Sequence, residues 1–248
     1  MAVGRNQYLC QITVTLDITS FDHVSGLASH HPLGVSTGIF ADDRGSWRQL
    51  VDDACGISSY VVELSALSGD ELPGLISYLR SEPALPFRYL SVHGPAKNFD
   101  EGIVVEQLGE LPLAVRSVVL HPDVMSDIAA YRGLGTRLVI ENMDGRKKTG
   151  RTVEELASVF EELPEAGFCF DVAHAWSIDP TMELAHALLD QFRAKLRHVH
   201  LSSLDSNDHH VPLRGDDEQL FAEVLGRCTD VPWVLEAMPP TKWMSHRS

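Results

Sequence analysis

The sequence lacks several features that would place it in other protein classes. It has no run of 18 or more apolar residues, so we expect no membrane-spanning helix. The first residues show no long apolar core followed by a small-residue cleavage site, so we expect no secretory signal. The cysteines form no CxxC pair and are widely spaced, at Cys10, Cys55, Cys169 and Cys228. We therefore expect reduced, structural cysteines in a cytoplasmic protein.

Basic residues are also scarce. The 248 residues include 20 Lys and Arg against 35 Asp and Glu, which gives a formal net charge of −15. Proteins that bind nucleic acid usually gain most of their affinity from Lys and Arg contacts to phosphates. The composition therefore disfavours a nucleic-acid partner and favours a small substrate. In contrast, histidine is frequent, with 12 residues.

Short apolar runs alternate with segments of helical periodicity, which is the pattern of a parallel sheet with helices between the strands. Eight runs are predicted to be strands: 33–39, 58–65, 88–94, 115–121, 136–142, 166–171, 196–202 and 232–237. No GxGxxG follows the first run, which disfavours a dinucleotide-binding fold. Eight units in a chain of this length predict an α/β fold of the (β/α)8 TIM-barrel type.

The two ends depart from an ideal barrel. Residues 10–18 alternate apolar and polar side chains, which predicts an extra strand in an N-terminal extension, 1–32. Few residues follow the eighth run, so we expect a reduced or missing last helix. We assign 33–248 to a metal-dependent catalytic domain and the whole chain to a single domain.

Helix-start signals support these boundaries. Ser68 with Glu71 and Thr152 with Glu155 have the spacing of capping boxes, and Asp179 precedes a proline as an N-cap residue does.

Metal-ligand residue types stand at the ends of six successive predicted strands, the third to the eighth. In a (β/α)8 barrel these ends converge on one volume, which is where active sites lie. The candidate ligands are His93, His121, Glu141, Asp171, His174, His200, Asp208, His210 and Glu236. Each one alone is more often a satisfied polar residue or a helix cap, but their joint placement predicts a metal site.

The chemistry of the set indicates which ions it would hold. Carboxylates packed together repel one another, and a divalent cation removes that repulsion. Imidazole with carboxylate suits Zn²⁺, Mn²⁺ or Fe²⁺ better than Ca²⁺. His198 shares a strand face with His200, and we leave open whether it is a ligand, a support for a ligand or barrel filler.

These motifs resemble the xylose isomerase-like TIM-barrel superfamily, which includes endonuclease IV and sugar isomerases and epimerases. The resemblance covers roughly 33–238 and rests on HGP at 93–95, HP at 121–122, EN at 141–142, DVAH at 171–174, HLSS at 200–203, DHH at 208–210 and LEAMP at 235–239. It implies one of two metal sites. The single-metal isomerases would use Glu141, Asp171, His200 and Glu236. The endonuclease IV-like members would use all nine candidate ligands to hold three zinc ions.

A local cluster of basic residues bears on the substrate. Arg146 and Lys147 follow the fifth predicted strand, Lys97 follows the third and Arg214 follows the seventh. They are either part of solvated loops or a binding site for a phosphate or carboxylate on a small anionic substrate.

Three functions remain open at this point. The first is metal-dependent hydrolysis of a phosphoester or related bond, with Glu141, Glu236 and His174 as catalytic residues and up to three zinc ions. The second is isomerisation or epimerisation of a sugar or sugar phosphate with one Mn²⁺ or Mg²⁺, and the third is a degenerate barrel that only binds a partner. We expect no organic cofactor and no membrane partner, and leave the oligomeric state open. Cleavage of DNA at abasic sites is disfavoured by the charge and by the short loops between the ligands.

Overall fold

The computed structural model describes residues 31–40 and 43–239. The predicted extra strand at 10–18, the extension that contains it and the segment expected to lack a last helix fall almost wholly outside these residues.

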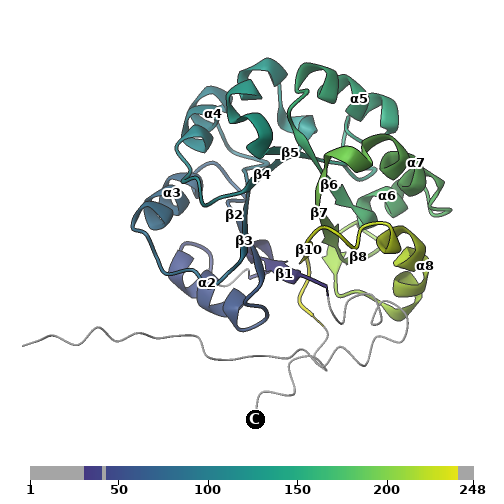
Figure 1. The fold of residues 1–248 in the computed structure, drawn as a ribbon, viewed down its shortest axis with the longest axis horizontal. Coiled ribbons are helices and arrows are strands. Elements are labelled where there is room, and N and C mark those ends of the chain that lie inside the picture. The colour runs from purple at the N-terminus through teal and green to yellow at the C-terminus, as the bar shows by residue number, and fades with distance from the viewer. Residues whose placement is uncertain (1–30, 41–42, 240–248) are drawn as a thin grey trace, which may run out of the picture.

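Eight parallel strands close into a barrel in the order β1-β10-β7-β6-β5-β4-β3-β2 (Figure 1). Their bounds are β1 Leu33–Ser36, β2 Val61–Ser65, β3 Tyr89–His93, β4 Ser117–Leu120, β5 Leu138–Glu141, β6 Gly167–Asp171, β7 Leu196–Leu201 and β10 Trp233–Leu235. Each falls within one predicted run, so the (β/α)8 prediction is confirmed. The strands are shorter than the runs because the outer residues of several runs form the connecting turns.

Helical segments surround the barrel in Figure 1. The α-helices are α2 Trp47–Cys55, α3 Leu72–Arg80, α4 Glu101–Gly109, α5 Val153–Glu162, α6 Val172–Ile178, α7 Glu183–Phe192 and α8 Gly215–Gly226. The 3-10 segments are η1 Thr37–Ile39, η2 Pro122–Val124, η3 Ile128–Arg137 and η4 Arg193–Lys195. A hairpin of β8 Ser203–Leu204 and β9 His210–Val211 follows β7. Within the described residues, no helix is both long and apolar enough to cross a membrane.

The helix-start predictions had different outcomes. Thr152 caps α5 by accepting from the Glu155 amide at 3.3 Å, as predicted. The other two predicted N-caps were wrong, because α3 begins only at Leu72 and α7 only at Glu183. The Glu71 carboxylate instead accepts from the Leu67 amide, and Asp179 accepts from the Leu184 amide. Both carboxylates thus hold the loops that precede the helices.

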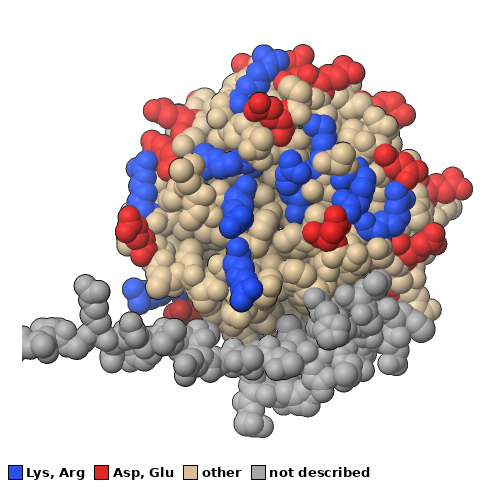
Figure 2. Space-filling model, in the orientation of Figure 1, with Lys and Arg blue, Asp and Glu red and all other residues tan. Residues whose placement is uncertain are grey.

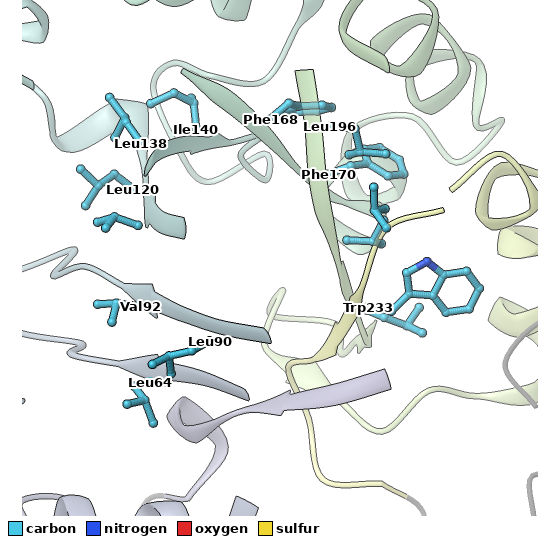
Figure 3. Packing of buried hydrophobic residues seen from close by; sticks show 14 of the residues in the cluster. Leu64, Leu90, Val92, Leu120, Leu138, Ile140, Phe168, Phe170, Leu196 and Trp233 are labelled. Atoms are coloured by element: carbon cyan, nitrogen blue, oxygen red, sulfur yellow. The ribbon is translucent and has the colours of Figure 1, made fainter. Parts of the chain in front are cut away.

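Large apolar side chains fill the space between the strands and the helices. In Figure 3 the labelled residues, among them Leu64, Leu90, Phe168 and Trp233, stand on the outer side of the strands. Successive residues of a strand point to opposite faces, so the residues between them point into the barrel. The inward set includes a small apolar cluster of Val119, Val139 and Cys169, together with buried polar side chains.

Candidate metal centre

The predicted ligands from six strands meet at one end of the barrel. His93, Glu141 and Asp171 are the last residues of β3, β5 and β6, and His200 is the next-to-last residue of β7. His121 and Glu236 come directly after β4 and β10. All strands are parallel, so these positions share the same end of the barrel, and the side chains are buried or nearly so.

Glu141 lies at the middle of the cluster, and its two carboxylate oxygens face different histidines. Oε2 is 3.2 Å from His93 Nε2 and 3.4 Å from His121 Nε2. Oε1 is 3.3 Å from His174 Nδ1 and 3.4 Å from His200 Nδ1. One carboxylate therefore belongs to two neighbouring sets of donors.

The donors form three overlapping groups, in each of which the ligand atoms lie within 4.8 Å of one another. The groups are His93, His121 and Glu141; Glu141, Asp171, His200 and Glu236; and Asp171, His174 and His210. Glu236 also links groups, because Oε1 is 3.2 Å from His200 Nδ1 and Oε2 is 3.5 Å from His210 Nδ1.

The donor atoms fit divalent cations in two respects. Asp171 Oδ2, His200 Nδ1 and Glu236 Oε2 are buried and have no hydrogen-bond partner. Zinc–ligand distances of about 2.0–2.1 Å place two ligands of a tetrahedral ion about 3.3 Å apart. The separations of His93 Nε2, His121 Nε2 and His200 Nδ1 from the Glu141 oxygens are 3.2–3.4 Å. The chain thus presents unpaired lone pairs at the spacing that such an ion needs.

Backbone carbonyls set the protonation of two imidazoles. His93 Nδ1 lies 2.8 Å from the carbonyl of Gly94, and His174 Nδ1 lies 2.9 Å from that of Asn142. A carbonyl can only accept, so both Nδ1 atoms carry the proton. The Nε2 atoms are then free to donate a lone pair to a cation.

The charges of the cluster oppose one another when no cation is present. Burial alone would raise the pKa of Glu141, but His200 and His121 hold that pKa well below its usual range. Burial together with Glu141 and Asp171 raises the pKa of Glu236 well above its usual range, although His200 opposes the shift. Burial opposes protonation of His174, but Asp171 and Glu141 raise its pKa to about 10, whereas burial lowers the pKa of His210 to about 4. A divalent cation would remove the proton held among the carboxylates.

A pocket of about 270 Å³ opens over the cluster, and six of the predicted ligands line it: His93, His121, Glu141, His174, His210 and Glu236. Arg146 and Lys147, in the loop between β5 and α5, also line it. Each is paired with a carboxylate. Arg146 binds both oxygens of Asp144, and Lys147 Nζ lies 3.1 Å from Asp123 Oδ2.

Three predicted residues do not join the cluster or the pocket lining. Asp208 is partly exposed in a turn at φ 57° and, within the described residues, belongs to none of the groups, so Asp171 stands with His174 and His210 instead. Lys97 is exposed. Arg214 donates to Asp217 at 2.9 Å and to the Leu204 carbonyl at 2.8 Å, and it does not line the pocket.

The structure also places residues near the site that the sequence reasoning missed. Asp144 is buried, and its Oδ2 lies 3.8 Å from His174 Nε2. The side chain of Asn142 pairs with both backbone groups of Asp171 at 2.8 Å and so ties the ends of β5 and β6 together. Glu63 lies deeper, against His198 and His200. The position of Glu63 in the middle of a run of buried strand residues was a signal that could have indicated its role.

Basic side chains also gather at the opposite end of the barrel. Successive strands and helices run clockwise in Figure 1, and right-handed βαβ connections mean that this view is from the N-terminal ends of the strands. In the same view, Lys and Arg gather near the middle of the face and Asp and Glu near its rim (Figure 2). Arg88, Arg116 and Arg137 directly precede strands, so they belong to this end. They are therefore separate from Arg146 and Lys147.

A closed parallel barrel with polar side chains gathered at the carboxyl ends of its strands defines the class of (β/α)8-barrel proteins with a site at that end. Residues 123–245 match the family model of the xylose isomerase-like TIM barrel. The second half of the chain thus matches the family that its motifs indicated.

Solved structures of several activities share this fold. Endonuclease IV from Thermus thermophilus is 20% identical, with a TM-score of 0.56 over 86% of this chain and 95% of that one. The 3-keto-D-glucoside 4-epimerase of E. coli is 15% identical, with a TM-score of 0.52 over 85% and 93%. D-psicose 3-epimerase from Clostridium cellulolyticum is 13% identical, with a TM-score of 0.53 over 84% and 85%. The curated proteins contain no match to this sequence. These likenesses show the fold, and the activity has to be argued from the site.

Proposed function

We propose that this protein is a metal-dependent hydrolase of a phosphoester or related bond in a small anionic substrate, with a multinuclear metal site. The observation that carries the proposal is the position of Glu141, with His93 and His121 at one oxygen and, at the other, His200, which shares a group of donors with Asp171 and Glu236. A single ion needs only one of these sets. A carboxylate with a separate set of donors at each oxygen is suited to bridge two ions.

The proposed ligands are His93, His121, Glu141, Asp171, His174, His200, His210 and Glu236, with Asp208 as a further candidate. Two or three zinc ions held there would polarise the phosphoryl oxygen and favour ionisation of a water nucleophile. His93 and His174 would serve with Nε2, because their Nδ1 protons are already donated to carbonyls.

The pocket supports a small anionic substrate. Its volume of about 270 Å³ is near the lower end of ligand pockets. Arg146 and Lys147 are the proposed binding residues for the anionic group, since both line the pocket. Lys97 and Arg214 are weaker candidates, because neither lines it. Glu141, Glu236 and His174 remain the proposed catalytic residues.

A second candidate function is a single-metal isomerase or epimerase of a sugar or sugar phosphate, which would use one Mn²⁺ or Mg²⁺. The group of Glu141, Asp171, His200 and Glu236 favours it, because these four residues could bind one ion without the other candidate ligands. In that reaction Glu141 and Glu236 would exchange protons with the substrate carbon.

Metal content decides between the two candidates. Elemental analysis of the purified protein should find two to three zinc ions per chain, and the loaded protein should hydrolyse members of a panel of small phosphoesters. Glu141→Ala should lose ions from both of its groups and all activity. His93→Ala should lose one ion and most of the activity.

His186→Ala is a matched control, because His186 lies on α7 and contacts Arg227 rather than the site. It should keep the metal content of the unaltered protein. If the protein binds a single ion per chain and epimerises a sugar, and if His93→Ala keeps that activity, the hydrolase proposal is wrong and the isomerase or epimerase proposal takes its place.

A further inference from the structure

Glu63 is a carboxylate buried inside the barrel, beneath the candidate metal centre. It lies on β2 between the outward-facing Val62 and Leu64, and it is 0% exposed. The interior of a (β/α)8 barrel is usually filled by branched aliphatic side chains. Removing a carboxylate from water is costly unless polar partners compensate. A glutamate buried at this position is therefore expected to have a specific role.

The partners of Glu63 are imidazoles and a hydroxyl. His200 Nε2 lies 3.2 Å from Oε1 and 3.3 Å from Oε2. The Ser91 hydroxyl donates to Oε2 at 3.0 Å, and His198 Nε2 lies 3.4 Å from the same oxygen. Within the described residues, Glu63 forms its ion pairs with histidines and with no Lys or Arg.

His200 connects Glu63 to the candidate metal centre because its two ring nitrogens face opposite ways. Nε2 faces Glu63, while Nδ1 lies 3.2 Å from Glu236 Oε1 and 3.4 Å from Glu141 Oε1 and has no hydrogen-bond partner. When Nδ1 binds a cation, the ring proton is on Nε2, where the Glu63 carboxylate can accept it. A ligand histidine usually donates its other N–H to such a carboxylate or carbonyl.

We propose that Glu63 is a positioning residue that holds the His200 imidazole, with Nδ1 directed into the Glu141, Asp171 and Glu236 group, and so sets its affinity for a divalent cation. The inference rests on the proposed function only in that His200 is a metal ligand. It names a residue outside the ligand set and explains why the barrel interior is polar at this depth.

His198 also contacts Glu63, and it lies deeper in the barrel than His200 because it comes two residues earlier on β7. Its Nδ1 lies 2.9 Å from the Tyr89 hydroxyl, which in turn lies 2.7 Å from the Ser117 hydroxyl. Oε2 of Glu63 is thus bordered by His198 as well as His200, and His198 has a hydrogen-bond partner of its own. His198 acts as a support for Glu63 rather than as a ligand.

Cys169, His198 and His200 also lie close enough together to suggest an inner metal site. The geometry favours the hydrogen-bonded arrangement. His200 Nε2 already faces Glu63 at 3.2 Å, and with an inner site the imidazole of His200 would have to bind an ion at each nitrogen.

The test compares Glu63→Gln with the unaltered protein, because glutamine keeps the volume and removes the charge. Zinc affinity is measured by competition with a coloured chelator, and the ligand field by the visible absorption of the Co²⁺-loaded protein. We expect zinc affinity to fall about 10–100-fold and the Co²⁺ spectrum to change. Glu63→Asp keeps the charge, but its side chain is shorter by one methylene. Its zinc affinity should therefore lie between that of Glu63→Gln and that of the unaltered protein.

Cys169→Ala is the matched control at the same depth, and it should leave zinc stoichiometry and affinity unchanged. Loss of one ion in Cys169→Ala would overturn the proposal in favour of an inner metal site. A folded Glu63→Gln protein, verified by circular dichroism, with the affinity and Co²⁺ spectrum of the unaltered protein would also overturn it. If Glu63→Gln does not fold, the same two measurements are made on Glu63→Asp, and a zinc affinity and Co²⁺ spectrum equal to those of the unaltered protein would overturn the proposal.

The same measurements separate this inference from the proposed function. If the unaltered protein binds zinc but hydrolyses no phosphoester, the function fails and the role of Glu63 is still measured by affinity. If hydrolysis is found but Glu63→Gln binds zinc normally, only the role of Glu63 fails.

Discussion

Arg146 and Asp144 form a two-pronged ion pair at the rim of the pocket, with Nε 3.0 Å from Oδ1 and a terminal nitrogen 2.8 Å from Oδ2. The remaining terminal nitrogen lies 3.3 Å from the carbonyl of Asn207, in the loop of the β8–β9 hairpin. Asp144 Oδ2 is also 3.8 Å from His174 Nε2. One basic side chain thus joins two loops over the site, next to a predicted ligand.

Arg146→Ala should weaken the binding of an anionic substrate. Hydrogen bonds to charged groups contribute about 1.5–3 kcal/mol, so KM should rise about 10–100-fold while kcat changes less. Steady-state kinetics on the best phosphoester substrate would measure this. Lys148→Ala is the control, since Lys148 is exposed in the same loop and does not line the pocket. Equal KM values for the two variants would remove Arg146 from the binding site.

Asp144 should make the metal-free protein more sensitive to acid. Burial alone would raise the pKa of its carboxyl, but hydrogen bonds from Arg146 lower it to about 2, from an ordinary value of 3.8. A pKa that is depressed in the folded state contributes stability above pH 3.8, and this stability is lost as the pH falls toward 2.

The measurement is the free energy of unfolding of the metal-free protein at pH 5 and pH 3, compared with that of Asp144→Asn. The unaltered protein should lose about 1 kcal/mol more than the variant over this range. Asp127→Asn, which changes an exposed carboxylate, should retain the acid sensitivity of the unaltered protein. If Asp144→Asn loses as much free energy of unfolding between pH 5 and pH 3 as the unaltered protein, Asp144 is not the cause of the acid sensitivity.

Gly34→Ala should destabilise the barrel where β1 meets β2. A Cβ at Gly34 would lie 2.2 Å from the Val61 carbonyl oxygen, so a strand backbone would have to move. Overpacking of this kind costs about 1–3 kcal/mol, which thermal or denaturant unfolding would detect. Gly109→Ala, where a Cβ meets nothing within 4 Å, is the control and should not destabilise. Similar unfolding midpoints for both variants would contradict the close approach of β1 and β2.

The sequence could predict the barrel and the general place of the site because both depend on local patterns. Apolar runs of strand length, repeated eight times with helical segments between them, are enough to indicate a (β/α)8 fold. The parallel strands then require that His93, Glu141 and Asp171, at the ends of their runs, face the same side of the molecule.

Local patterns do not determine where a loop side chain points or what it pairs with. Arg214 follows a strand as predicted, but its guanidinium is held by Asp217 on the first turn of α8. Asp208 stands two residues from His210 in the sequence, yet the hairpin turn separates it from the cluster, and Asp171 takes the place beside His174. Glu63 was missed because its partners come from β3 and β7, far away in the sequence.

The sequence by itself thus determined which segments form strands, that these strands are parallel, and which residue types stand at their carboxyl ends. Strand periodicity and strand ends are properties of short segments, so they can be recognised without the tertiary structure. Only the tertiary structure decided that Glu141 faces a different pair of histidines with each oxygen, and that His200 turns Nε2 toward Glu63 and Nδ1 toward Glu236. These relations depend on closing the barrel, which brings side chains from distant strands within about 3 Å of one another.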